Sequence, residues 1–215
     1  MFKGLTLQLT LTTCISKGQT LSTTAPSNPI LVDRIISRSL ASDIVLIVFG
    51  VALTAAAAQL QIPASPVPFT FQTLAVLLIG ATYGGSRAAI TMASYVLVGA
   101  LGLPVFAGGA SGAEKIFGAT GGFLLGFIFA AWLTGYLAQL SWSSNAVKMF
   151  VSFALGSVVI YAVGVPVLAM VAFKSDLLAA TTYMFPYLIW DAVKAVLAAG
   201  IVPGAFVLVN KIKKS

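Results

Sequence analysis

An acidic and a basic residue stand three positions apart inside a long apolar run near the end of the chain, YLIWDAVKAVL. In a helix, Asp191 and Lys194 lie on one face and can form an ion pair. A charge placed well inside a bilayer costs about 2.5 kcal/mol or more, so both side chains should face protein or a watery cavity. The pair therefore predicts a binding site within a membrane bundle; an ion pair that only joins helices is the alternative.

The hydrogen-bonding chemistry of these two side chains indicates a type of ligand. A carboxylate accepts hydrogen bonds from N–H groups, whereas an ammonium donates to a carbonyl or carboxylate oxygen. Together they suit a neutral group that offers both donors and an acceptor, such as an amide or a urea. We therefore expect a small, partly apolar metabolite that enters from outside.

The composition of the chain places this pair in a membrane protein. The 215 residues are 59% hydrophobic and only 8% charged, whereas soluble domains carry about 25% charged residues. So few charges cannot cover a water-facing surface, and the mean hydropathy is +1.03. The sequence therefore indicates an integral membrane protein.

Several functions are excluded by residues that the chain lacks. It has no His and a single Cys, Cys14, so it can build neither a His-based metal site nor a disulfide framework nor a Ser–His or Cys–His hydrolase. No GxxxxGK[ST] phosphate loop is present for ATP hydrolysis. The net charge of +7 comes mostly from basic residues between apolar stretches, which is typical of membrane topology and not of nucleic-acid binding. We expect no enzymatic activity, no metal and no cofactor.

Helix-breaking residues divide the chain from Asp43 onward into apolar stretches, which predict an all-α bundle of about six transmembrane helices. The stretches run near residues 44–60, 71–83, 88–103, 123–139, 149–173 and 185–209. The second and third are short for a bilayer core of ~30 Å, so we expect tilt or local irregularity there.

We predict three parts along the chain. Residues 1–40, rich in Ser and Thr, form a disordered or interfacial segment, for which a misassigned start codon or an organelle transit peptide are alternatives. Residues 41–210 form the membrane domain, and residues 211–215 form a basic cytoplasmic tail.

Charge asymmetry orients the predicted bundle. With six crossings both termini share a side, and that side holds seven basic residues: Arg34, Arg38, Arg87, Lys148, Lys211, Lys213 and Lys214. On the opposite side the charges cancel within two pairs, Glu114 with Lys115 and Lys174 with Asp176. The positive-inside rule therefore predicts a multi-pass plasma-membrane protein with both termini in the cytoplasm.

The predicted outer loop between the third and fourth helices, LPVFAGGASGAEKIFGATGG, is half small residues yet carries Phe106 and Phe117. Glycines let a backbone approach a ligand closely, and a plain linker would not need two aromatic side chains. The loop therefore indicates a ligand cover, with a mobile surface loop as the alternative.

Small residues also recur in the first apolar stretch, VALTAAAAQL. Ala52, Ala55, Ala56 and Ala57 have the spacing that allows two helices to approach closely. The partner helix is either within this chain or in another subunit, and the spacing does not decide between them.

Four blocks of the chain, in this order, carry a family resemblance: VPFTFQTLAVLLIG, YVLVGALGLPVFAGG, GATGGFLLGF and WDAVKAVLA. Over about residues 52–210 the sequence resembles the BioY family, the biotin-binding substrate subunits (S-components) of energy-coupling factor (ECF) transporters. The resemblance implies capture of extracellular biotin and its delivery inward. A solitary or proton-coupled biotin carrier, or an S-component for another vitamin, are alternatives.

The resemblance also implies which residues bind the ligand. Asp191 and Lys194 match the D-x-x-K motif that contacts the biotin head group. The residues of the Gly-rich loop and of the start of the fourth helix that match by motif are Phe106, Gly108, Gly109, Thr120 and Gly122. Where relatives carry GPTGGY this chain has GATGGF, and Lys115 is our first expectation for the biotin carboxylate.

Partners are implied in the same way. Family S-components dock through an Ala-x-x-x-Ala face in the first helix, here Ala52 and Ala56, on a transmembrane coupling subunit. Two separate ATPase subunits would then supply energy, which agrees with the missing phosphate loop. We expect biotin, this coupling module and the lipid bilayer as partners.

Overall fold

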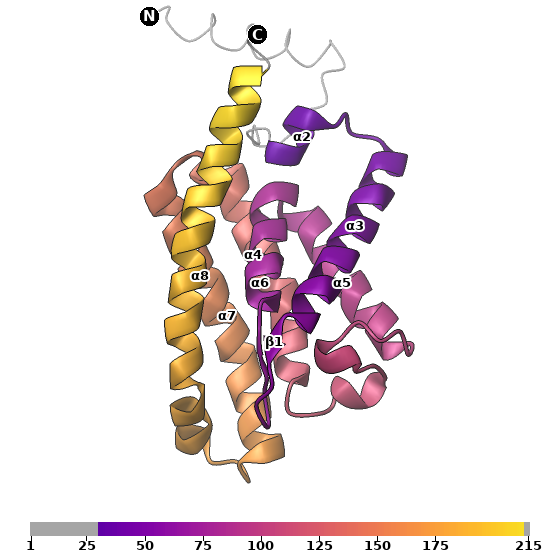
Figure 1. Ribbon diagram of the computed structural model, residues 1–215, viewed down its shortest axis with the longest axis vertical. Helices are drawn as coiled ribbons and strands as arrows, with labels where there is room; N and C mark the ends of the chain where they lie inside the picture. Colours follow the sequence, from indigo (N-terminus) through magenta and orange to yellow (C-terminus); the bar gives the residue numbers. More distant parts are fainter. Residues whose placement is uncertain (1–29, 213–215) are drawn as a thin grey trace, which may run out of the picture.

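The computed structural model describes residues 30–212, and within them the chain is a bundle of helices (Figure 1). The helices are α2 Leu31–Ile35, α3 Leu40–Gln59, α4 Gln72–Tyr83, α5 Gly85–Ala100, α6 Gly121–Gln139, α7 Ala146–Ala172 and α8 Leu177–Ile212. Between them lie the short strands β1 Gln61–Ile62 and β2 Phe69–Thr70 and the 3-10 turns η1 Ala107–Gly109, η2 Ala113–Lys115 and η3 Trp142–Ser144. The predicted all-α class is confirmed.

Local chemistry explains where several helices begin. The Ser39 side chain accepts a hydrogen bond from the Ser42 amide and Ser42 returns one, which is a capping box for α3. Asn145 caps α7 by accepting from the amides of Val147 and Lys148. After α3, three prolines between residues 63 and 68 cannot continue a helix, and the chain forms the β1–β2 hairpin instead.

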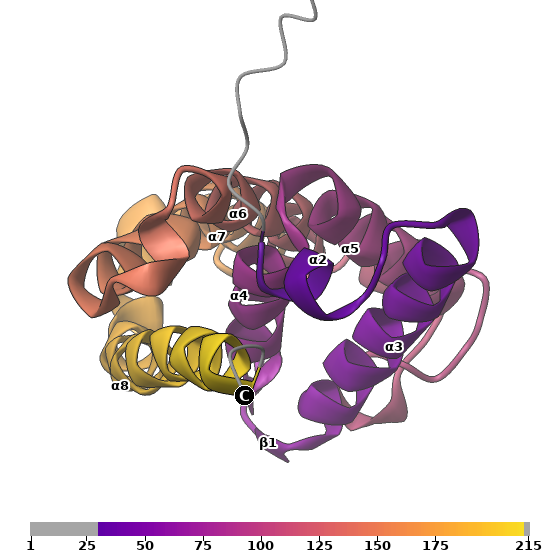
Figure 2. The ribbon, with the colours of Figure 1, turned by 90° about the horizontal axis from the view of Figure 1, so that it is seen from above.

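The bundle has α6 at its centre. Helix α6 packs against α4, α5 and α7, and it is the most buried of the long helices, whereas α3 is the least buried. Seen along the bundle, α3 and α8 lie on opposite flanks with α4 between them (Figure 2). Close packing needs small residues: a β-carbon on Gly135 would lie 2.4 Å from the backbone of Gly84.

Four of the described helices are long and apolar enough to cross a membrane: α3, α6, α7 and α8. Helix α4, with 12 residues, and α5, with 16 residues, are shorter, as expected for the second and third predicted stretches. Each of the six predicted stretches is thus a helix, but the number that cross the membrane stays a prediction.

The last helix starts earlier than the sequence indicated. Helix α8 begins at Leu177 instead of near Phe185. Asp176 caps it by accepting from the Ala179 amide, and Pro186 is accommodated inside the helix. At ~1.5 Å per residue, Asp191 therefore lies about 20 Å from the start of α8, whereas a start near Phe185 would place it about 10 Å along the helix.

The two described ends of the chain lie at the same end of the bundle (Figure 1). Ile30 and Leu31, which open α2, are buried, and Arg34 Nη1 donates to Asn210 Oδ1 near the end of α8 at 2.8 Å. Most of the predicted N-terminal segment 1–40, namely residues 1–29, lies outside the described residues, as do residues 213–215 of the predicted tail.

Candidate ligand-binding site

The acid and the base of the sequence motif form an ion pair inside the bundle. Lys194 Nζ lies 2.9 Å from Asp191 Oδ1, and their side chains are 13% and 7% exposed. One helical turn of α8 holds both, because positions three apart share a face. The predicted juxtaposition of the two charges is present, on the side of α8 that packs against α4 and α7.

Two other helices complete the surroundings of the carboxylate. Thr73, in the first turn of α4, donates from Oγ1 to Asp191 Oδ1 at 2.9 Å. Tyr161, in α7, donates its hydroxyl to Asp191 Oδ2 at 2.6 Å. Three helices therefore meet at one carboxylate, which is held from both sides.

The ammonium of Lys194 has no hydrogen left to offer. Its three N–H groups point to Thr70 O at 2.7 Å, Thr73 Oγ1 at 2.9 Å and Asp191 Oδ1 at 2.9 Å. Asp191 Oδ2, by contrast, accepts one described hydrogen bond and retains a lone pair. The pair is thus ready to accept a hydrogen bond from a ligand, but it donates one only if Lys194 gives up Thr70 or Thr73.

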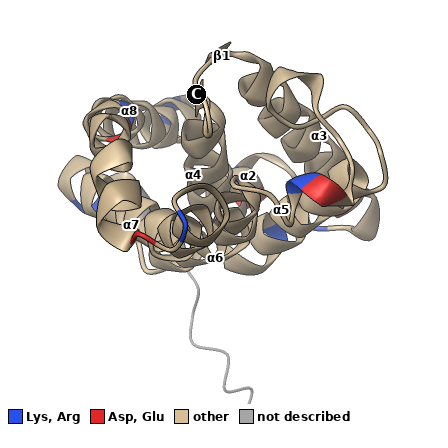
Figure 3. Cartoon of the chain, turned by 90° about the horizontal axis from the view of Figure 1, so that it is seen from below, with Lys and Arg blue, Asp and Glu red and all other residues tan. Residues whose placement is uncertain are grey.

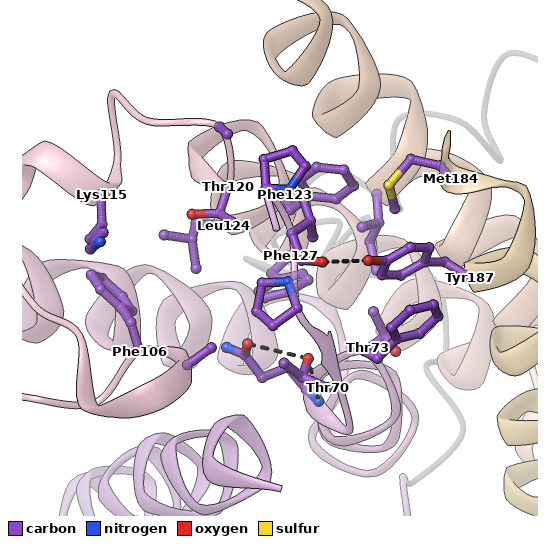
Figure 4. Close-up of a pocket in the computed structure, with 18 of the residues that line it drawn as sticks. Thr70, Thr73, Phe106, Lys115, Thr120, Phe123, Leu124, Phe127, Met184 and Tyr187 are labelled. Atoms are coloured by element: carbon purple, nitrogen blue, oxygen red, sulfur yellow. Dashed lines mark hydrogen bonds between the residues drawn. The ribbon is translucent and has the colours of Figure 1, made fainter. Parts of the chain in front are cut away.

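A cavity of about 510 Å³ opens over this pair. That volume lies within the ~300–1,000 Å³ typical of small-molecule sites. Its wall is largely apolar and aromatic, with polar groups at a few points, and it includes Phe106, Phe123, Leu124, Phe127, Met184 and Trp190. Figure 4 shows Lys115 and Phe106 on one side of the cavity and Met184 and Tyr187 on the other. The cavity can hold an elongated ligand with two different ends.

The β1–β2 hairpin forms one wall of the cavity and is tied to α8. The ring of Phe69 stacks on that of Tyr187 with centroids 3.6 Å apart, and the Tyr187 hydroxyl donates to Val67 O. Lys194 adds its bond to Thr70 O at the end of the same hairpin. One helix thus supplies both the charged pair and the anchor for the wall above it.

The Gly-rich segment between α5 and α6 forms the opposite wall. Phe106 is buried, packs edge-on against Tyr95 at 5.6 Å and covers Gly99, where a β-carbon would lie 2.2 Å from its ring. The Tyr95 hydroxyl accepts from Gln72 at 2.7 Å and donates to Val105 O at 2.9 Å. These contacts hold the segment against the cavity.

Comparison with known proteins identifies the family of this chain and several relatives. The model of the BioY family matches residues 26–211. The chain belongs to the BioY family. A biotin transporter BioY from Thermotoga maritima is 40% identical over 149 residues, which are 69% of this chain and 86% of that protein. A probable biotin transporter BioY from Pyrococcus horikoshii is 32% identical over 159 residues, 74% of this chain and 92% of that protein.

A solved structure shares the fold of this BioY-family chain. It is the crystal structure at 2.1 Å of the S-component for biotin from an ECF-type ABC transporter. The TM-score is 0.66, with 23% identity, over 83% of this chain and 96% of that one. The family and the four long apolar helices indicate a multi-pass membrane protein, as the sequence predicted, and its fold is that of the solved S-component.

The structure brings five of the predicted ligand residues of this BioY-family chain to one cavity. Asp191, Lys194, Phe106, Lys115 and Thr120 all line it.

The three predicted glycines lie elsewhere. Gly108 and Gly109 are exposed in η1, next to the lining residues Ala107 and Ala110. Gly122 is buried against α7, where a β-carbon would lie 2.7 Å from Val163 O. None of the three lines the cavity; the first two shape a turn and the third allows two helices to pack.

Three residues that contact the ion pair were not predicted. Thr70 and Thr73 stand in the VPFTFQT block, and Tyr161 is a hydroxyl within the apolar α7. A hydroxyl in a membrane helix costs free energy unless it forms a hydrogen bond, so the sequence indicated that Thr73 and Tyr161 each need a hydrogen-bond partner. Which partner each one meets depends on helices far apart in the chain.

A second group of charges lies at the other end of the bundle. Arg87 bonds Asp33 at 3.2 Å and Asp43 at 2.8 Å, and Arg38 also pairs with Asp33. The hydrogen bonds that Arg38 donates to the Asp33 carboxylate raise the pKa of the Arg38 guanidinium above its ordinary value. None of these four residues lines the cavity. Seen from below, the positions of Lys, Arg, Asp and Glu are few and scattered along the ribbon (Figure 3).

Proposed function

We propose that this chain binds biotin in the cavity over Asp191 and Lys194 and delivers it inward across the membrane as the substrate-binding component of a transporter. The observation that carries the proposal is the buried ion pair facing a largely apolar cavity in a chain of the BioY family. The activity of this family is transport, so biotin is cargo here and not a cofactor of an enzyme.

The donor and acceptor groups support one orientation of biotin. Its ureido ring offers two N–H donors and one carbonyl acceptor. The free lone pair of Asp191 Oδ2 suits a ureido N–H, and the ureido carbonyl takes a hydrogen of Lys194 by replacing Thr70 or Thr73. The valerate carboxylate then points toward Lys115 and Phe106, across the cavity from Tyr187 (Figure 4).

The proposed topology has six crossings with both termini in the cytoplasm. Helices α4 and α5 are too short to span the hydrocarbon core upright, and they are supported by α6 beside them. Charge supports this direction, since Arg34, Arg38 and Arg87 cluster with the two described chain ends. The cavity and the Gly-rich loop then face outward.

The energy-coupling partner is proposed to dock on α3. Ala52 and Ala56 are exposed, whereas Gly50, Thr54 and Ala57 of the same helix are buried toward the bundle. Their exposure favours contact with another subunit over packing within the chain. A transmembrane coupling subunit and two ATPase subunits complete the proposed assembly, because this chain has no phosphate loop of its own.

The docking proposal is tested with Ala52→Leu and Ala56→Leu together. Bulky side chains block close helix approach, so biotin uptake by cells should fall at least tenfold while the purified protein binds biotin as before. Equal loss of binding and uptake would show that these alanines pack within the chain. Uptake that survives ATP depletion but stops with an uncoupler would indicate a proton-coupled carrier instead.

Ligand identity and orientation are tested by calorimetric titration of the purified protein with biotin, biotin carboxamide and a ureido-modified analogue. Hydrogen bonds to charged groups contribute about 1.5–3 kcal/mol, so changing the ureido group should weaken binding ten- to a hundredfold or more. The carboxamide should lose less, because Lys115 is exposed and water screens its charge. If the carboxamide binds most weakly, the proposed orientation is reversed.

A further inference from the structure

We propose that Gln59 is a positioning residue that ties the turn beside the bound ligand to α3, so that ligand occupancy of the cavity reaches the exposed face of that helix. The inference rests on the proposed function, because the ligand is biotin and the exposed face is the docking face proposed above. Gln59 is the last residue of α3 and does not itself line the cavity.

The side-chain amide of Gln59 makes a two-point contact with the backbone of the Gly-rich segment. Its Nε2 donates to Phe106 O at 3.0 Å, and its Oε1 accepts from the Gly109 amide at 2.9 Å. These partners lie 47 and 50 residues further along the chain. The side-chain amide thus donates one hydrogen bond to the backbone of the turn and accepts one from it, as a neighbouring strand would.

The turn that Gln59 holds is part of the cavity wall. Phe106, Ala107 and Ala110 line the cavity on either side of the two contacts. Gly108 and Gly109 both have φ of +70°, a conformation that favours glycine. Because glycine is conformationally permissive, the two Gln59 hydrogen bonds are what fix the turn in its present shape. A ligand that presses on the Phe106 ring or orders this turn therefore acts directly on the Gln59 hydrogen bonds.

The same amide is bound into α3. Gln59 Nε2 also donates to Ala55 O at 3.2 Å, and Gln59 follows Ala52 and Ala56 along the helix. Because α3 is the least buried of the four long helices, fewer packing contacts resist its displacement than for α6, α7 or α8. The contact chain from cavity wall to exposed helix face is therefore short and passes through one side chain.

The first experiment measures biotin dissociation from the purified protein. Gln59→Met keeps the length of the side chain and removes both loop contacts, and Gln59→Glu keeps only the acceptor for Gly109. Gln61→Met is the control, since in the described part of the chain the Gln61 side chain makes no hydrogen bond. Two lost hydrogen bonds correspond to about tenfold faster release for Gln59→Met and no change for the control. Gln59→Glu should release biotin at least as fast as Gln59→Met, because its carboxylate would face the carbonyl oxygens of Phe106 and Ala55.

A purely structural role is distinguished by the melting temperature in detergent, measured with and without biotin. Because the Gln59 hydrogen bonds are present without ligand, their loss lowers both temperatures, but we expect the rise on adding biotin to be smaller in Gln59→Met than in wild type. If release is unchanged in Gln59→Met, or if biotin raises its melting temperature as much as that of wild type, the inference is wrong. If wild type fails to bind biotin at all, the proposed function is wrong instead.

The second experiment tests the link to α3. An environment-sensitive fluorophore is placed on Ala56→Cys in a Cys14→Ser background, and saturating biotin is added to forms with Gln59 or Gln59→Met. We expect a biotin-dependent change in emission that is at least severalfold smaller without the Gln59 contacts. An equal change in both forms would overturn the proposed link even if the release rates differ.

Discussion

The two ends of the bundle carry similar charge groups with different surroundings. At one end Asp191 and Lys194 are paired, mostly buried and open onto a cavity of about 510 Å³. At the other end Arg87 joins Asp33 and Asp43, also with little exposure of the arginine, but none of the three lines that cavity. Pairing is common to both groups, and so is burial of all members except Asp43, whose side chain is 40% exposed.

The two groups differ in whether a hydrogen-bonding atom that is still free borders the cavity. Arg87 is directed to two carboxylates and fastens α5 to the segments around α2 and α3. Asp191 Oδ2 has a spare lone pair and borders the largely apolar cavity. A buried ion pair therefore indicates a binding site only where it also borders a cavity, because a pair with fully used groups can serve packing alone.

The largest effect on biotin binding is expected from breaking the pair at the cavity. Asp191→Asn and Lys194→Ala each leave a buried group without its charged partner, so biotin affinity should fall at least a hundredfold by calorimetry. The double variant Asp191→Asn with Lys194→Gln should also lose binding but should fold better than Lys194→Ala, as judged by its melting temperature in detergent. Wild-type affinity in both single variants would remove the pair from the site.

A smaller effect is expected from the two hydroxyls that hold the carboxylate. Tyr161→Phe and Thr73→Val each remove a hydrogen bond to Asp191 with little change in shape, so affinity should fall about tenfold. Thr73→Ser should restore binding, because it keeps the hydroxyl. If Thr73→Ser is as weak as Thr73→Val, the lost contact is packing of the methyl group and not the hydrogen bond.

Still less is expected from the exposed lysine at the far side of the cavity. Lys115→Gln should weaken biotin binding only a few-fold, since solvent screens this charge. The same substitution should leave the affinity for biotin carboxamide unchanged, and added salt should reduce the difference between the two proteins. A loss that is equal for both ligands would show that Lys115 does not meet the carboxylate.

The charges at the opposite end should have no effect on affinity. Arg87→Gln leaves Asp33 and Asp43 without this partner, so the melting temperature should fall by several degrees while the biotin dissociation constant stays at its wild-type value. Weaker binding in Arg87→Gln, at a temperature where the protein is folded, would mean that the two ends of the bundle are coupled.

Local features of the sequence determined the membrane class, the six helical stretches and the ion pair. Composition excludes a water-facing surface, three closely spaced prolines before Phe69 prevent a helix there, and residues three apart on a helix always share a face. The start of α8 was the exception, because the sequence did not indicate that Pro186 would be accommodated within the helix after a cap at Asp176.

Tertiary structure alone decided what each of these features contacts. Tyr161 and Thr73 reach Asp191 from 30 and 118 residues away, and Gln59 meets Phe106 across 47 residues. The sequence also could not tell that Gly122 serves helix packing while Thr120 lines the cavity. Spacing along one helix sets which side chains share a face, but the rotation and depth at which two helices pack set which faces meet, and these follow from the packing of all the helices together.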